Sequence, residues 1–136
     1  MWSPYFLHLL AEVLGRTGQA AAGLELTTEA VDRADRTGAR WIEAELHRLR
    51  GELLMALPAP ERHEATACFR QALAGAREQN ARLWELRAGT SLARLWRDQG
   101  EQHKARDLLA PVYGWFTEGF GTADLQDAKA LLAELR

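Results

Sequence analysis

The fold is decided by residues 40–76, which are RWIEAELHRLRGELLMALPAPERHEATACFRQALAGA. Apolar and small residues recur at helical spacing on both sides of Pro58-Ala59-Pro60, which breaks a helix because proline lacks the amide donor. We expect the two helices to touch at the small residues Gly51 and Ala72. The middle of the chain therefore predicts an antiparallel helix pair.

The segments on either side of this pair repeat its pattern. The small residues of the three first helices fall 40 and 42 residues apart, at Ala11, Gly51 and Ala93, and their second-helix counterparts are Ala30, Ala72 and Val112. Recurrence at such a period is typical of helical repeats that pack on their neighbours. We expect one all-α domain over residues 1–136, with repeats at 3–37, 40–80 and 82–120.

A further helix is predicted over residues 123–135. Its apolar residues share one face, at Leu125, Ala128, Leu132 and Leu135. An amphipathic helix of this kind buries one side only. We therefore expect it to act as a capping helix over the C-terminal end of the stack.

Composition narrows the classes of partner. The formal net charge of the 136 residues is −2, and the charges of both signs are interspersed, so neither nucleic acid nor an anionic membrane is an expected partner. The N-terminal segment carries no basic residue before Arg16, which does not fit a signal peptide. The single Cys68 fits a small core residue in a reducing compartment, so we expect a cytoplasmic protein.

The spacing within the repeats resembles that of the tetratricopeptide (TPR) repeat. The small residues and the turn glycine follow the order Ala11-Gly18-Gly23-Ala30 in the first repeat and Ala93-Gly100-Ala105-Val112 in the third. The period of about 40 exceeds the usual 34, so we expect longer helices. The resemblance implies a TPR-like antiparallel helical hairpin solenoid that binds proteins on its concave face.

A more specific resemblance concerns residues 40–54, 91–100 and 112–116. These stretches are similar to the C-terminal repeat tail of large bacterial proteins that join a class III nucleotide cyclase or DNA-binding domain to an AAA-type ATPase. The resemblance implies a regulatory or scaffolding tail of a signalling protein. No Gly-x-x-x-x-Gly-Lys-Ser/Thr loop is present in the 136 residues, so it implies no nucleotide-hydrolysing activity.

The sequence shows no pattern that predicts catalysis or metal binding. The histidines, His8, His47, His63 and His103, form no His-Glu-x-x-His motif, and the single cysteine forms no Cys-x-x-Cys motif. Ser91 is interpreted as a small packing residue. The aromatic residues Phe69, Trp96, Tyr113 and Phe116 follow core positions, which favours a core over a ligand cage. We expect no enzyme, no cofactor and no metal.

Candidate partner-binding residues lie on the first helices of the repeats, which line the inner face of a helical-repeat stack. The expected exposed stripes are Trp41, Glu45, Arg48, Glu52 and Met55, followed by Arg87, Thr90, Arg94 and Arg97. Arg87, Arg94 and Arg97 are spaced to form a basic ridge that binds the carboxylates of an acidic protein or peptide. The other interpretations are a solvated face of salt bridges, or a sensor that binds a small ligand or peptide in the groove.

The first helix is apolar nearly all round, which indicates burial on more than one side. In a longer parent protein a preceding repeat would cover this patch, whereas in the isolated chain it is expected to bind another copy of itself. We therefore predict a homodimer through the first helix pair, with Trp2, Tyr5, Phe6 and Leu9 near its centre.

Overall fold

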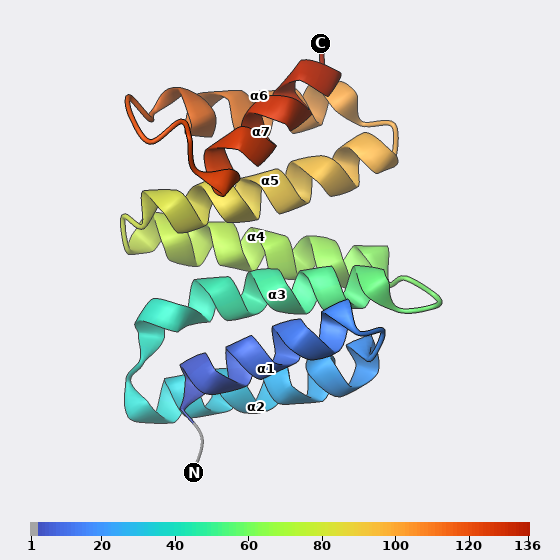
Figure 1. Ribbon diagram of the computed structural model, residues 1–136, viewed down its shortest axis with the longest axis vertical. Helices are drawn as coiled ribbons and strands as arrows, with labels where there is room; N and C mark the ends of the chain where they lie inside the picture. Colours follow the sequence, from blue (N-terminus) through green and yellow to red (C-terminus); the bar gives the residue numbers. More distant parts are fainter. Residues whose placement is uncertain (1–2) are drawn as a thin grey trace.

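The computed structural model describes residues 3–136, except for the side chain of Arg40, and every regular element in this range is helical. Figure 1 shows the helices in one stack, with the first helix pair at one end and the last two helices at the other. They are α1 (Pro4–Arg16), α2 (Ala20–Thr37), the 3-10 turn η1 (Arg40–Ile42), α3 (Glu43–Ala56), α4 (Arg62–Glu78), α5 (Arg82–Asp98), α6 (Gln102–Gly114) and α7 (Ala123–Glu134). The all-α prediction is confirmed. Trp2, which was predicted near the centre of the homodimer contact, lies outside the described residues.

Local sequence signals explain several helix ends. The hydroxyl of Ser3 accepts a hydrogen bond from the amide of Phe6 at 3.2 Å, and Pro4 opens α1 without losing a hydrogen bond. Gly38 ends α2 in the left-handed conformation, with φ of 75°. Asn80 adopts φ of 54° in the turn before α5, a conformation that asparagine tolerates.

Two predicted helix starts are wrong. Pro60 does not open the fourth helix, because the amide of Glu61 donates to the carbonyl of Leu54 at 3.3 Å and keeps this segment in the turn. Trp41 lies in η1 instead of an α-helix, and the 3.4 Å bond from Ile42 to the Ala39 carbonyl has the shorter i to i+3 spacing of a 3-10 turn.

The odd-numbered and even-numbered helices form two layers. Helix α3 packs against α1 and α5 as well as its sequence neighbours, and α5 packs against both α3 and α7. Among the described residues, the even-numbered helices make no comparable contact with one another. The layer of odd-numbered helices is therefore the more closely packed one. Figure 1 shows α1 in front of α2 and α7 in front of α6.

The recurrent small residues are helix-packing positions. All six predicted positions are buried: Ala11, Ala30, Gly51, Ala72, Ala93 and Val112. A Cβ atom on Gly51 would lie 2.5 Å from the Cε1 atom of Phe69, closer than real contacts allow. Helices α3 and α4 can approach this closely only because residue 51 is glycine, as the sequence predicted.

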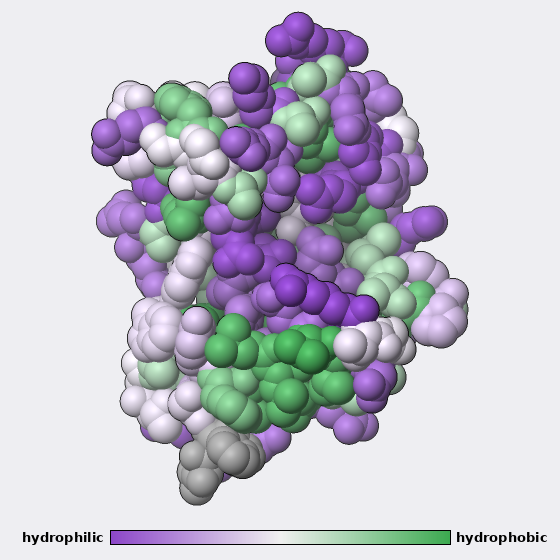
Figure 2. All heavy atoms as spheres, in the orientation of Figure 1, coloured by the Kyte–Doolittle hydropathy of each residue, from purple (hydrophilic) through white to green (hydrophobic). Residues whose placement is uncertain are grey.

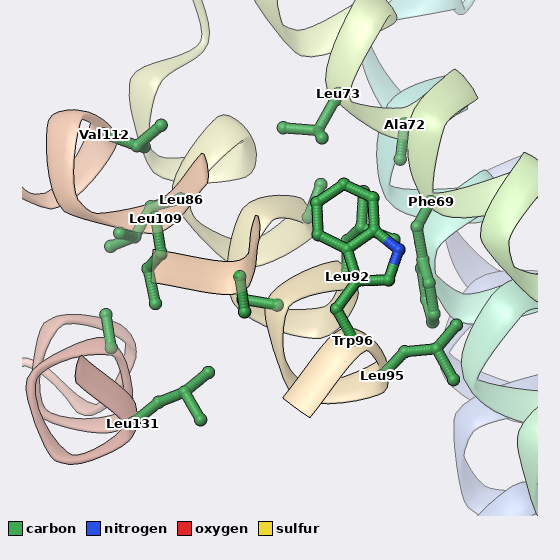
Figure 3. Close-up of a cluster of buried hydrophobic side chains, with 14 of the residues drawn as sticks. Phe69, Ala72, Leu73, Leu86, Leu92, Leu95, Trp96, Leu109, Val112 and Leu131 are labelled. Atoms are coloured by element: carbon green, nitrogen blue, oxygen red, sulfur yellow. The ribbon is translucent and has the colours of Figure 1, made fainter. Parts of the chain in front are cut away.

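The main core lies between α4, α5, α6 and α7. Figure 3 shows the indole ring of Trp96 turned toward α4, in the cluster that contains Phe69 and Leu73. Phe69 and Trp96 are buried, whereas Tyr113 and Phe116 are only half-buried against the cluster. Cys68 and Ser91 are also buried, as expected for small packing residues.

Helix α7 covers one end of this core. It packs on α5 and α6 through the buried residues Leu125, Ala128, Leu131 and Leu135. Leu132, predicted on this face, is only half-buried, and Leu131 takes its place. None of the helices in the part of the chain that the structure describes is long and apolar enough to cross a membrane.

Candidate binding groove

Two adjoining cavities of about 390 and 120 Å³ lie along the odd-numbered helices. Both are lined by Arg48, Arg87 and Arg94, and we call the combined cavity the arginine groove. It extends from Glu12 and Arg16 of α1 to acidic residues of α7. Figure 2 shows hydrophilic residues gathered across the middle of this face of the molecule. The predicted residues Arg48, Glu52, Arg87 and Arg94 are therefore brought together in one groove, joined at its α7 end by Asp124 and Asp127.

Glu45 lies beneath the groove and not on its surface. Its side chain is 3% exposed and is paired with Arg48, while its other carboxylate oxygen accepts from Arg87 at 2.5 Å. Thr90 is also buried and donates its hydroxyl hydrogen to the Leu86 carbonyl at 2.8 Å. The prediction that the Glu45 side chain is exposed is wrong, whereas Thr90, although nearly buried, lines the smaller cavity of the arginine groove.

The repeat itself explains the burial of Glu45. Residues 45 and 87 occupy the same position in successive repeats, 42 residues apart, so stacking α3 on α5 places them side by side. A carboxylate and a guanidinium at equivalent positions then neutralise each other. Glu52 and Arg94 are related by the same offset and both line the larger cavity, but no ion pair joins them.

Only one arginine of the predicted ridge is available for a partner. Arg87 pairs with Glu45 and, at 3.5 Å, with Asp124. Arg97 pairs with Asp98 at 3.0 Å and with Glu134 of α7 at 2.5 Å. Arg94 forms no ion pair within residues 3–136. The ridge therefore combines both predicted interpretations, with two arginines in salt bridges and one unpaired.

Arg94 lies where three cavities meet. It lines both parts of the arginine groove and also a third cavity of about 80 Å³. The walls of this third cavity include the apolar side chains of Met55, Phe69 and Leu95, together with the acidic residues Glu52 and Asp98 at its polar edge. A half-buried guanidinium thus lies beside an apolar notch, an arrangement that suits a carboxylate next to an aliphatic group.

His8 is a buried polar residue close to the groove charges. It occupies the same repeat position as Arg48, 40 residues earlier, and neither ring nitrogen has a hydrogen-bond partner. Burial lowers the pKa of His8 below its usual 6.5, although the carboxylates of Glu45 and Glu12 act in the opposite direction. His8 is therefore held neutral in the folded chain near pH 7.

Trp41, like Arg97, is a predicted partner-binding residue that does not line the arginine groove. Its exposed ring is 6.2 Å from that of Tyr5 and 6.3 Å from that of Trp84, measured between centroids. It therefore forms part of an aromatic row across α1, η1 and α5. The prediction that Trp41 shares an exposed stripe with Arg48 and Glu52 is wrong, because Trp41 lies in the 3-10 turn and not in the α-helix that carries the other two.

Sequence reasoning missed the two ends of the groove. Glu12 and Arg16 belong to α1, and Asp124 and Asp127 belong to α7, which was expected only as a cap. The part played by Glu12 could have been predicted from the repeat offsets, because residues 12, 52 and 94 occupy equivalent positions in the three repeats. No comparable signal exists for α7, which lies outside the repeats.

The described residues contain no group of three or more His, Cys, Asp or Glu side chains able to hold a metal ion. The structure defines the chain as an all-α protein with a charged groove along one helix layer. Searches against protein-family models, curated proteins and solved structures found no match. The relationship to TPR proteins therefore stays a prediction that rests on the residues quoted above.

Proposed function

We propose that the chain is a protein-binding module, a TPR-like helical hairpin solenoid of three long repeats and a capping helix. The support is the recurrence of buried small residues at offsets of 40 and 42 residues and the closer packing of the odd layer. Closer packing on one side curves such a stack towards that side. The arginine groove then lies on the concave face.

Arg94 is the observation that carries this proposal. Arg48, Arg87 and Arg97 around it are all paired with carboxylates, whereas Arg94 is half-buried without one. A guanidinium offers five N–H donors and binds a carboxylate through two of them. A carboxylate from outside the chain would complete the pairing pattern at this position.

The surrounding acidic residues set the selectivity of the groove. Glu12, Glu52, Asp124 and Asp127 line its walls, so a ligand with many closely spaced negative charges would be repelled. One carboxylate at Arg94, beside an aliphatic group in the notch of Met55 and Leu95, fits both the charge and the space. We therefore propose an extended peptide with a single Asp or Glu anchor as the ligand, and not nucleic acid.

The biological setting follows from the sequence resemblance alone. A repeat domain of this type suits a regulatory or scaffolding tail of a bacterial signalling protein in the cytoplasm. A small-ligand sensor is the second candidate, and the volume of the larger cavity favours it. At about 390 Å³ that cavity is within the size range of small-molecule sites.

Peptide display on the immobilised protein tests the proposal. Selection from a random dodecapeptide library should enrich sequences with Asp or Glu next to an aliphatic residue. Their affinity should fall at least about tenfold in Arg94→Glu, equivalent to about 1.4 kcal/mol. Arg106→Glu, an exposed charge reversal on α6, should bind like the wild type.

The sensor is distinguished by thermal shift with a panel of small carboxylic acids. A sensor at 100 times its dissociation constant gains about 2.7 kcal/mol of stability, which the melting midpoint reports. Enrichment of peptides without an acidic residue, or equal affinity for wild type and Arg94→Glu, contradicts the acidic-peptide proposal.

A further inference from the structure

Helix α1 has a second apolar face that is partly exposed to solvent. Phe6, Leu9, Leu10 and Val13 are between 39% and 53% exposed, and we call these four residues the α1 seam. Figure 2 shows a continuous hydrophobic surface over α1. The opposite side of the helix, with Leu7 and Ala11, is fully buried in the stack. The helix is therefore apolar on two sides, as its sequence predicted.

The seam has the spacing of a helix–helix contact. Its residues lie at i, i+3, i+4 and i+7, which places them in one stripe along about two turns. Elsewhere in the described chain, apolar stripes of this spacing pack against a neighbouring helix. A second helix is therefore the occupant whose shape fits the seam.

The seam is also complementary to itself. Its residue numbers are symmetric about the midpoint between Leu9 and Leu10, so an antiparallel copy places Leu9 against the copy's Leu10 and Phe6 against the copy's Val13. Each pairing joins a larger with a smaller side chain, or two leucines, which keeps the spacing between the helices even. We propose that the chain forms a twofold homodimer in which the two α1 helices pack antiparallel through this seam.

The available area matches a specific but modest dimer. Tyr5 and the neighbouring ring of Trp41 extend the exposed apolar surface beyond the seam. Together these six side chains expose on the order of 500 Å², as large as the biggest patches on monomers. Two copies would bury roughly 1,000 Å², near the lower limit of specific interfaces, so dissociation in the micromolar range is expected.

Charge argues against a membrane as the occupant. No lysine or arginine precedes Arg16, and the only ionised side chain on α1 before it is Glu12. Helices that lie on anionic membranes carry basic residues along the rim of the apolar face. The α1 seam has no such rim, whereas a second copy supplies an equally apolar surface.

Disulfide trapping tests the symmetry directly. In the double variant Phe6→Cys/Val13→Cys, each cysteine should face its counterpart on the copy and give a covalent dimer on mild oxidation. Either single variant should cross-link at least about tenfold more slowly. In a single variant the two cysteines, one on each copy, lie seven residues apart along the helix axis. At a rise of about 1.5 Å per residue this is roughly 10 Å, which a disulfide cannot span. Equal rates in single and double variants would overturn the antiparallel arrangement.

Light scattering behind gel filtration tests the dimer without cysteines. The wild type should have a dimeric mass at about 100 µM, well above a micromolar dissociation constant, and Leu9→Asp/Leu10→Asp should be monomeric with unchanged helical circular dichroism. Phe120→Asp, an exposed apolar residue after α6, should remain dimeric. A monomeric wild type at this concentration refutes the proposal, as does a monomer that sediments with phosphatidylcholine–phosphatidylserine vesicles.

Discussion

Glu45 of α3 and Arg87 of α5 are 42 residues apart in the sequence and joined by a 2.5 Å hydrogen bond. They occupy the same position in two successive repeats, and the stacking of those repeats buries the carboxylate between Arg48 and Arg87. This pairing fixes two arginines of the groove and leaves Arg94 as the one without a carboxylate. The burial of Glu45 therefore follows from the repeat offset that stacks α3 on α5.

The first prediction concerns this buried carboxylate. Glu45→Gln should lower the free energy of unfolding by about 1–3 kcal/mol, because Arg48 and Arg87 lose a charged partner while remaining partly buried. Glu52→Gln is the matched control, since Glu52 is half-exposed and 3.8 Å from Arg48. It should change stability by less than about 0.5 kcal/mol in urea unfolding. Equal effects of the two substitutions would show that Glu45 does not organise the groove.

The second prediction concerns the contact between α3 and α4. Gly51→Ala should destabilise the fold by about 1–3 kcal/mol through overpacking against Phe69, despite the better helix propensity of alanine. Gly75→Ala tests the same exchange in α4, where the nearest atom to the added Cβ is Ala44 Cβ at 3.5 Å. That variant should gain up to about 1 kcal/mol. A gain in both variants would contradict the close approach at Gly51.

The third prediction is a loss of stability in mild acid. Burial lowers the pKa of both His8 and His47 below 6.5, so below that pH the unfolded chain binds protons that the folded chain does not. The free energy of unfolding should therefore be highest above pH 6.5. It should fall as the pH decreases from there towards the folded-state pKa values, by at most about 1.4 kcal/mol per pH unit for each histidine.

Replacement of His8 separates its contribution. His8→Leu removes two buried nitrogens without partners, so it should stabilise the chain by about 1 kcal/mol at pH 7 and by more at pH 5.5. An identical pH dependence in His8→Leu and wild type would show that His8 is not the group responsible.

The recurrence of small residues was sufficient to predict an all-α chain with buried small residues at the six recurrent positions, but not the 3-10 turn at Trp41 or the start of α4. Gly51 and its equivalents Ala11 and Ala93 are set by steric fit, which leaves a local signature in the sequence. The groove was only partly predictable, because the exposure of a charged side chain depends on its neighbour in space. Glu45 was wrongly placed on the surface for this reason, although the 42-residue offset to Arg87 contained the information needed to pair them.

The contribution of α7 could not be predicted from its sequence. Its apolar face indicated a cap, but nothing local indicated that Glu134 would pair with Arg97 or that Asp124 would approach Arg87. These pairings depend on the angle at which α7 crosses α5, which is set by the whole of the core. The selection of Arg94 as the unpaired residue therefore required the three-dimensional structure.

The most direct test of the central claim is an NMR titration that observes the arginine Nε–H signals of the ¹⁵N-labelled protein. The ligand is an acidic peptide taken from the display selection, and a version with Asp or Glu replaced by Asn or Gln is the control. The Arg94 signal should shift most, with backbone shifts confined to the groove around Ser91 and Asp127, and the control peptide should cause none of these changes. Shifts centred on α2, α4 or α6, or an Arg94 signal that does not respond to a bound peptide, would contradict the proposed role of the arginine groove.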